Sequence, residues 1–285
     1  MGIFSEINRS KEELGETAQK RGFFKFFEIF FRKIRYFMLA NLVYTLYLIP
    51  TFVIIYIVSF AITMPITEES AALNNFSAVL LANLYISVFG AGPATSGMTY
   101  IMRNFAREEN AWVWSDFFAA VKGNFKQSLV VFVTDIIMVV LFTGAVFAYS
   151  NLTGYAAIIR YILYFGITIF TIMHMYIYPI MVTFDLKLID IYKNSFIFAI
   201  LKLPSNLAIL AVLAFLHIGL PLFAISGGGA NMLYFSAILI LAEAVVTQAF
   251  SAFLVNFGVY PRLKKYMLDA TIQKKGEIND AGENS

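Results

Sequence analysis

The feature that most constrains this chain is a series of long apolar runs. Six of them reach about 20 residues or more, the length at which an α-helix rising about 1.5 Å per residue crosses a bilayer. They cover residues 36–63, 76–101, 127–149, 156–184, 207–226 and 232–258. None shows the period-two alternation of a membrane strand. We therefore expect an all-α, polytopic membrane protein with six transmembrane helices.

Composition excludes several other classes of protein. Hydrophobic residues make up 60% of the chain and charged residues 14%, and the mean hydropathy is +0.74, outside the usual range of a soluble domain. The net charge of +3 is too small to indicate a nucleic-acid partner. The absence of Cys excludes disulfides, Cys-based zinc sites and thiol catalysis. The polar first 21 residues predict no signal peptide.

The distribution of Lys and Arg predicts the orientation in the membrane, because cytoplasmic loops are enriched in these residues. The N-terminal segment carries eight, the second loop four, the fourth loop three and the tail five, which accounts for twenty of the 21 basic residues. The exception, Arg160, lies one turn inside the fourth run, from which it can reach outward. Both termini are therefore expected in the cytoplasm.

Similar segments recur along the chain. Pro93, Pro179 and Pro261 mark predicted cytoplasmic helix ends at spacings of 86 and 82 residues. The segments FFRKIRYFMLANL, FFAAVKGNFKQSL and FIFAILKLPSNL each place aromatic residues before a Lys and lead into a membrane run. This pattern predicts three parallel repeats, each a cytoplasmic interfacial helix followed by a transmembrane hairpin, about an axis normal to the membrane. Inverted repeats of the kind found in many transporters are not indicated.

Three regions follow from this pattern. Residues 1–35 are predicted to form a cytoplasmic segment whose helix GFFKFFEIFFRKIRYF lies in the membrane interface, attracted to the anionic inner leaflet. This helix is an anchor or, alternatively, a partner-binding element. Residues 36–258 form the six-helix transmembrane domain. Residues 259–285 form a cytoplasmic tail, and its polar distal part is predicted to be disordered.

The stretch VFGAGPATSGMTY, residues 88–100, has a composition typical of a phosphate-binding loop, yet it closes an apolar run. We expect Gly90, Gly92 and Gly97 to allow close helix packing. Pro93 removes one backbone donor and is expected to kink the helix. A kinked cavity wall is the functional alternative.

The second cytoplasmic loop contains the densest group of candidate functional residues. Trp112 and Trp114 suit an aromatic belt at the inner interface, and Asp116 is predicted to be the N-cap of a helix beginning DFFAAVKGNF. The alternative is that these residues, together with Lys122 and Lys126, dock a partner through aromatic anchors.

The same region carries a family resemblance. The residues that carry it are GPA at 92–94, RNFARE at 103–108, Trp112, Trp114, SDFF at 115–118 and KGNFK at 122–126. In these motifs the chain resembles the YesL-like family of bacterial integral membrane proteins, which has no established activity. The resemblance implies a bacterial cytoplasmic membrane and an association with carbohydrate-uptake ABC systems, whose genes often lie beside those of the family. It supplies no catalytic residues.

Four ionisable residues lie near the middle of their predicted spans, where a charge is costly and is normally kept for pairing or transport. They are Asp135, His174, His217 and Glu243. They can form a proton relay or bind a cation, or they can hydrogen-bond helices to one another. A metal pair of the two histidines is the weakest of these hypotheses, because neither has a close ligand partner in sequence. We expect no metal and no cofactor.

Enzyme motifs such as a P-loop, GxSxG or HExxH do not occur in the sequence, so we expect no enzymatic activity. Three functions remain: an accessory or assembly protein of a carbohydrate-uptake system, a small-solute transporter or exporter, and a regulatory or sensory membrane protein. The expected partners are the lipid bilayer, an ABC permease or other membrane protein, and a second copy of the chain. The transporter hypothesis is favoured if the four midplane residues line a common cavity.

Overall fold

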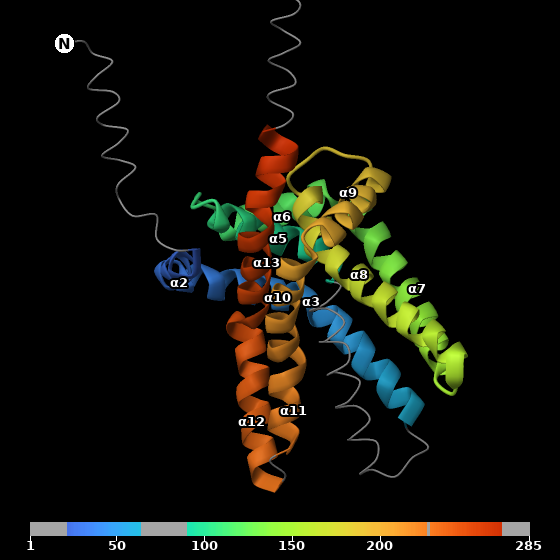
Figure 1. Cartoon of the computed structure of the whole chain (residues 1–285). Coiled ribbons are helices and arrows are strands. Elements are labelled where there is room, and N and C mark those ends of the chain that lie inside the picture. Colours follow the sequence, from blue (N-terminus) through green and yellow to red (C-terminus); the bar gives the residue numbers. More distant parts are fainter. Residues whose placement is uncertain (1–21, 64–89, 227–228, 270–285) are drawn as a thin grey trace, which may run out of the picture. The chain divides into compact units, whose positions relative to one another are not determined.

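A computed structural model describes residues 22–63, 90–226 and 229–269, and every regular element in these ranges is a helix (Figure 1). The chain divides into two units, Met1–Ile34 and Arg35–Ser285. In the first unit, α2 spans Gly22–Arg32, with Phe26, Ile29 and Phe30 buried. Residues 1–21 and 270–285, which include the tail predicted to be disordered, lie outside the described residues.

Long apolar helices coincide with the predicted runs of residues. They are α3 (Ile34–Thr63), α7 (Phe125–Tyr149), α8 (Ile158–Met181), α10 and α11 (Leu203–Ala214 and Leu220–Ser226), and α12 and α13 (Gly229–Ala242 and Gln248–Leu263). Within the described ranges, four helical segments are long and apolar enough to cross a membrane: Phe125–Tyr149, Gly154–Met181, Leu203–Ala224 and Tyr234–Leu268. In α3 the apolar stretch is Ile34–Pro50, and residues 76–89 of the second run lie outside the described part. The described part of the chain is thus all-helical and of membrane type.

Three helices form the centre of the second unit. α5 spans Pro93–Ala106, and α5, α8 and α13 contact one another in pairs. Most of α5 is buried, as are the last turns of α8. Two short helices cover this centre, α6 (Val113–Gly123) against α5 and α9 (Leu188–Leu201) against α8.

The outer helices expose apolar side chains. α7 and α8 pair with each other, as do α11 and α12 (Figure 1). Val140, Phe147, Ile162, Phe223 and Leu241 on these helices are each at least half exposed. Such a contiguous apolar exterior fits contact with lipid, because a water-soluble protein rarely leaves so much apolar surface uncovered.

The structure corrects the expectation that the second run continues as a kinked helix through Pro93. Gly90 and Gly92 have positive φ values of 85° and 58°, so the chain turns before the helix, and Pro93 occupies its first turn. Proline is favoured there because the first amides of a helix have no intrahelical acceptor. The Thr95 hydroxyl holds the turn by accepting the amide of Ala91 at 2.6 Å. Gly90 and Gly92 thus serve the backbone conformation.

Gly97 has the packing role predicted for the glycines. A Cβ placed there would lie 2.8 Å from the ring of Phe117 on α6, so the absence of a side chain lets α5 and α6 approach closely. The predicted equivalence of the three prolines is wrong. Pro93 begins α5, whereas Pro179 and Pro261 lie in the last turns of α8 and α13.

Two of the apolar runs contain π-helical turns that the sequence did not indicate. η2 (Phe215–Gly219) lies between α10 and α11, and η3 (Glu243–Thr247) lies between α12 and α13. A third, η4 (Lys264–Leu268), follows α13. Wide turns of this kind interrupt the regular hydrogen-bond ladder and are frequent at functional sites.

The turn before α5 gives a test of this fold. In Gly92→Ala, the new Cβ would lie 3.0 Å from Cβ of Phe132 and would require a backbone conformation that L-residues avoid. We expect a loss of about 1–3 kcal/mol in stability. Thermal unfolding in detergent measures it.

The control is Gly144→Ala on α7, where a Cβ meets nothing within 4 Å. A helical Gly→Ala change of this kind is expected to be neutral or to stabilise by up to about 1 kcal/mol. Equal melting temperatures for the two variants would contradict the positive φ and the close contact with Phe132 assigned to Gly92.

Candidate functional site

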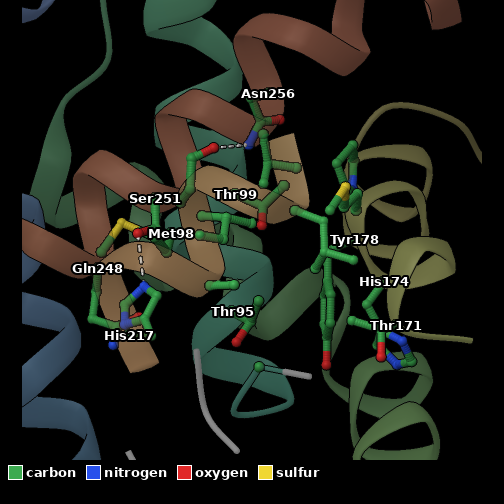
Figure 2. Close-up of a pocket in the computed structure, with 18 of the residues that line it drawn as sticks. Thr95, Met98, Thr99, Thr171, His174, Tyr178, His217, Gln248, Ser251 and Asn256 are labelled. Atoms are coloured by element: carbon green, nitrogen blue, oxygen red, sulfur yellow. Dashed lines mark hydrogen bonds between the residues drawn. The ribbon is translucent and has the colours of Figure 1, made fainter. Parts of the chain in front are cut away.

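A cavity of about 750 Å³ lies among α3, α5, α7, α8, α10, η2 and α13. Its volume is within the range of small-molecule binding sites. Figure 2 shows His217 and Ser251 on one side and His174 and Thr171 on the other, with residues of α5 between them. The residues of one cavity wall thus come from helices that are far apart in sequence.

Apolar side chains dominate the lining, and hydroxyl, amide and imidazole groups are distributed among them. The polar members are Tyr44, Thr95, Thr99, Thr143, Thr171, Tyr178, Ser251, Gln248, Asn256, His174 and His217. Among the described lining residues there is no Lys, Arg, Asp or Glu. Such a wall offers hydrogen bonds without a formal charge.

Asn256 is the lining residue with the clearest spare hydrogen-bonding capacity. The residue is almost completely buried. Its Nδ2 donates to the carbonyl of Ala252 at 2.7 Å, whereas its Oδ1 has no hydrogen-bond partner among the described residues. A buried acceptor of this kind is costly unless water or a ligand satisfies it. Asn256 thus carries one buried acceptor without a described partner beside the cavity.

The first carboxylate–imidazole pair joins α7 to α8. Nε2 of His174 lies 2.8 Å from Oδ1 of Asp135, and Nδ1 of His174 lies 2.9 Å from the carbonyl oxygen of Phe170. Asp135 is fully buried behind the histidine. Only His174 of the pair lines the cavity.

The second pair joins the two π turns. Nδ1 of His217, in η2, lies 3.1 Å from Oε1 of Glu243, the first residue of η3. Nε2 of His217 bonds to the Ser251 hydroxyl at 2.9 Å. The second carboxylate oxygen of Glu243 accepts Nε2 of Gln248 at 3.0 Å. His217, Ser251 and Gln248 line the cavity, and Glu243 lies behind them.

Asn41 of α3 supports the second π turn. Its Nδ2 donates to the carbonyl of Glu243 at 2.8 Å, and its Oδ1 accepts the amide of Ala249 at 2.8 Å. Asn41 is fully buried. One amide side chain therefore bonds to a backbone acceptor and a backbone donor at the two ends of the π turn, which fixes the position of Glu243.

Two arginines tie the inner helices together. Arg103, counted above as a loop residue, lies buried in the last turn of α5 and donates to the carbonyl of Val182 at the C-terminus of α8, where a cation is favoured. Burial lowers the pKa of Arg103, although a guanidinium stays charged at ordinary pH. Arg262 of α13 donates to Tyr176 of α8 and to Asn206 of α10, each at 2.6 Å.

The candidate partner surface lies on α6 and the start of α7. Trp112 is 82% and Trp114 63% exposed, and Lys122 and Lys126 are also exposed. Asp116 is not the N-cap, because α6 begins at Val113 with Trp112 as its N-cap residue. Its carboxylate instead reaches back one turn and accepts the amide of Trp112 at 2.8 Å.

The structure brings the four midplane residues together as two pairs. His174 and His217 line one cavity, whereas Asp135 and Glu243 each lie behind a histidine. Spacing alone did not predict these contacts. It also gave no indication of Asn41 or of Arg103, although an Asn inside an apolar run is a signal for a buried hydrogen-bonding role. No group of three or more His, Cys, Asp or Glu that could hold a metal occurs in the ranges described.

Comparison with known proteins gives one finding. A family model described as "Protein of unknown function, DUF624" matches residues 71–152. The YesL-like proteins carry this domain, and the matched range includes the turn before α5, Arg103, α6 and Asp135. No curated protein and no solved structure gives a significant match.

The support of the π turn can be tested by substitution. Asn41→Leu removes the hydrogen-bond partner of the Glu243 carbonyl and of the Ala249 amide at a fully buried position. We expect a loss of stability of about 1–3 kcal/mol for each group left without a partner. Thermal unfolding in detergent provides the measurement.

Asn194→Leu on α9 is the matched control, because the Asn194 side chain bonds to the carbonyl of Asp190 within its own helix. This change is expected to have a much smaller effect. If the two substitutions destabilise equally, Asn41 does not have the specific supporting role assigned to it.

Proposed function

We propose that this chain is a six-span membrane protein, with both termini in the cytoplasm, that binds a small neutral solute in its central cavity and carries it across the membrane. The observation that carries the proposal is that His174 and His217, each backed by a carboxylate, face the same cavity. Ionisable pairs are costly in a membrane unless they serve a pathway or join helices. Here they are combined with a cavity large enough for a solute.

The lining supports a particular class of solute. A wall of hydroxyls, amides and apolar side chains, without a charged side chain among the described lining residues, gives no strong attraction to an ion. It suits a neutral molecule with an apolar body and a few hydroxyl or amide groups, since a few polar groups in an apolar pocket fix a ligand's orientation.

The order of the helices along the chain supports three modules. A short helix precedes a long apolar helix at Gly22–Arg32, at Val113–Gly123 and at Leu188–Leu201. The last helices of the three modules, α5, α8 and α13, are those that contact one another in pairs. We propose that they are related by a pseudo-threefold axis normal to the membrane. In this arrangement the cavity adjoins the three inner helices.

Cysteine accessibility tests the cavity, because the chain has no native Cys. Thr99→Cys and Thr171→Cys place thiols on the lining. We expect both to react with a charged, membrane-impermeant thiol reagent in open vesicles at least about tenfold faster than thiols that face lipid, since only a thiol in contact with water can ionise.

Val140→Cys and Ile162→Cys are the controls, because both side chains are exposed on the apolar exterior. In the same open vesicles both should react at least about tenfold more slowly than the cavity thiols, and both should react fully after denaturation. If the cavity thiols react as slowly as these controls, the cavity is closed to water and the solute-binding function is wrong.

An accessory role in a carbohydrate-uptake ABC system is the second candidate. The observation that favours it is the exposure of Trp112 and Trp114 beside Lys122 and Lys126. Tryptophan is enriched at the centres of protein interfaces. In this role α6 would dock a permease subunit at the cytoplasmic face.

The double substitution Trp112→Ser with Trp114→Ser tests the accessory role. We expect a permease subunit that co-purifies with the wild-type chain in mild detergent to be lost from the double variant. The control is Phe147→Ser, which removes an equally exposed aromatic residue at the other end of α7. Recovery of the same subunit with all three chains would contradict a docking role for α6.

A further inference from the structure

The pattern of hydrogen bonds at His174 defines a proton-binding site. We propose that Asp135 and His174 together bind one exchangeable proton at the cavity wall, which the pair takes from and returns to cavity water. This inference rests on the proposed function, because it gives that function a coupling ion. It also has consequences that can be measured without knowing the solute.

The carbonyl of Phe170 fixes the protonation of one ring nitrogen. A carbonyl oxygen only accepts hydrogen bonds, so Nδ1 of His174, 2.9 Å away, must carry a proton. If the ring is neutral, Nε2 then has a lone pair directed at Oδ1 of Asp135, 2.8 Å away. A hydrogen bond at this distance requires a proton between Nε2 and Oδ1, on either the carboxyl group or the ring.

The two arrangements that satisfy both contacts have the same charge. One is a protonated Asp135 donating to a neutral ring, and the other is an imidazolium donating to a carboxylate. Both leave the pair with no net charge, which suits its complete burial. If the pair lost this proton, two hydrogen-bond acceptors would face each other with no proton between them, either at the Phe170 contact or at the Asp135 contact.

The second oxygen of Asp135 favours the neutral arrangement. Oδ2 is buried and has no hydrogen-bond partner in the described part of the chain. A carboxylate would leave a charged oxygen unsatisfied there, whereas a carboxylic acid leaves only a neutral carbonyl, which costs less. The proton therefore resides mainly on Oδ1 of Asp135 and is shared with Nε2.

The second pair does not impose the same requirement. Nε2 of His217 contacts the Ser251 hydroxyl, which donates or accepts. Nδ1 of His217 makes no hydrogen bond with a described residue, although Oε1 of Glu243 lies 3.1 Å away. A neutral ring therefore meets the Ser251 contact with either nitrogen protonated, and no added proton is needed. Gln248 donates to Glu243, which stabilises the carboxylate. Only the first pair is tied to an extra proton by its contacts.

Titratable groups also occur on the helices that hold the first pair and on the elements packed against them. The packed elements carry Tyr100 and Arg103 on α5, Tyr155 on η1 (Gly154–Ala157), Asp190, Tyr192 and Lys193 on α9, and Tyr260 and Arg262 on α13. Along α7 and α8 themselves lie Lys126, Tyr149, Arg160, Tyr161, Tyr164, Tyr176 and Tyr178. Burial raises the pKa of Tyr192 to about 12, so this phenol stays neutral. Arg103 and Arg262 are engaged with Val182 and with Tyr176.

Loss of the proton would change the wall of the cavity. His174 must then give up either its contact with Phe170 or its contact with Asp135, and its ring lies against the cavity. The freed nitrogen can bond to water or to a solute there. Proton release thus gives the cavity a new hydrogen-bonding nitrogen. A solute that bonds to this nitrogen binds the protonated and the deprotonated states with different affinities, which is what coupling requires.

Nitrogen NMR on histidine tests the site directly, because the chain has only two His. In the full chain carrying His217→Gln, reconstituted in lipid vesicles with ¹⁵N-histidine, all ring signals come from His174. We expect a protonated Nδ1 and a strongly hydrogen-bonded Nε2 at low pH, with a single transition as the pH is raised. Asp135→Asn should abolish the transition while Nδ1 keeps its proton, because the asparagine amide donates permanently to Nε2.

Asp190→Asn on α9 is the matched control and should leave the transition in place. An unprotonated Nδ1 at low pH, the lack of any transition, or a transition that survives Asp135→Asn would each overturn the proton site. Thiols that react in the cavity without this transition would refute the proton site alone. A transition in a chain whose cavity thiols do not react would refute the solute-binding function alone.

Discussion

A bilayer core supplies no hydrogen bonds, so every irregular backbone segment and every polar side chain within it must find a partner in the protein or in enclosed water. Two irregular segments of the described chain meet that demand with a single polar side chain each. Thr95 bonds to the turn before α5, and Asn41 bonds to the carbonyl of Glu243 in the π turn and to the amide of Ala249 just beyond it. Gly90 in the first segment and Gln248, which follows the second, line the cavity.

The same constraint accounts for the two carboxylate–imidazole pairs. Asp135 and Glu243 are each placed behind a histidine that faces the cavity. The difference between the pairs lies in the second contact of each ring, which is a carbonyl for His174 and a hydroxyl for His217. Whether this second partner can donate a hydrogen bond decides whether the pair needs a bound proton. Two similar pairs in one cavity can therefore have different roles, one binding a proton and one keeping a carboxylate.

The sequence predicted the helices well and the site only in part. Length and hydropathy located α3, α7, α8 and the α10–α13 region because a helix needs about 20 apolar residues to cross a membrane. It did not reveal the turn at Gly90 and Gly92, since the same small residues suit close packing and positive φ equally. It singled out His174 and His217. It could not show that they share a cavity, because the cavity depends on how helices that are distant in sequence pack against one another. Asn41 was missed because one amide in an apolar run does not identify its partner.

The proposed transport requires that α5, α8 and α13 enclose a hydrated cavity at membrane depth. An electron cryo-microscopy structure of the chain in a lipid nanodisc, at a resolution that shows ordered water, would reveal such a cavity. We expect water or solute density within hydrogen-bonding distance of His174, Ser251 and Asn256. A structure in which these helices close on one another, or in which lipid tails fill the space between them, would contradict it.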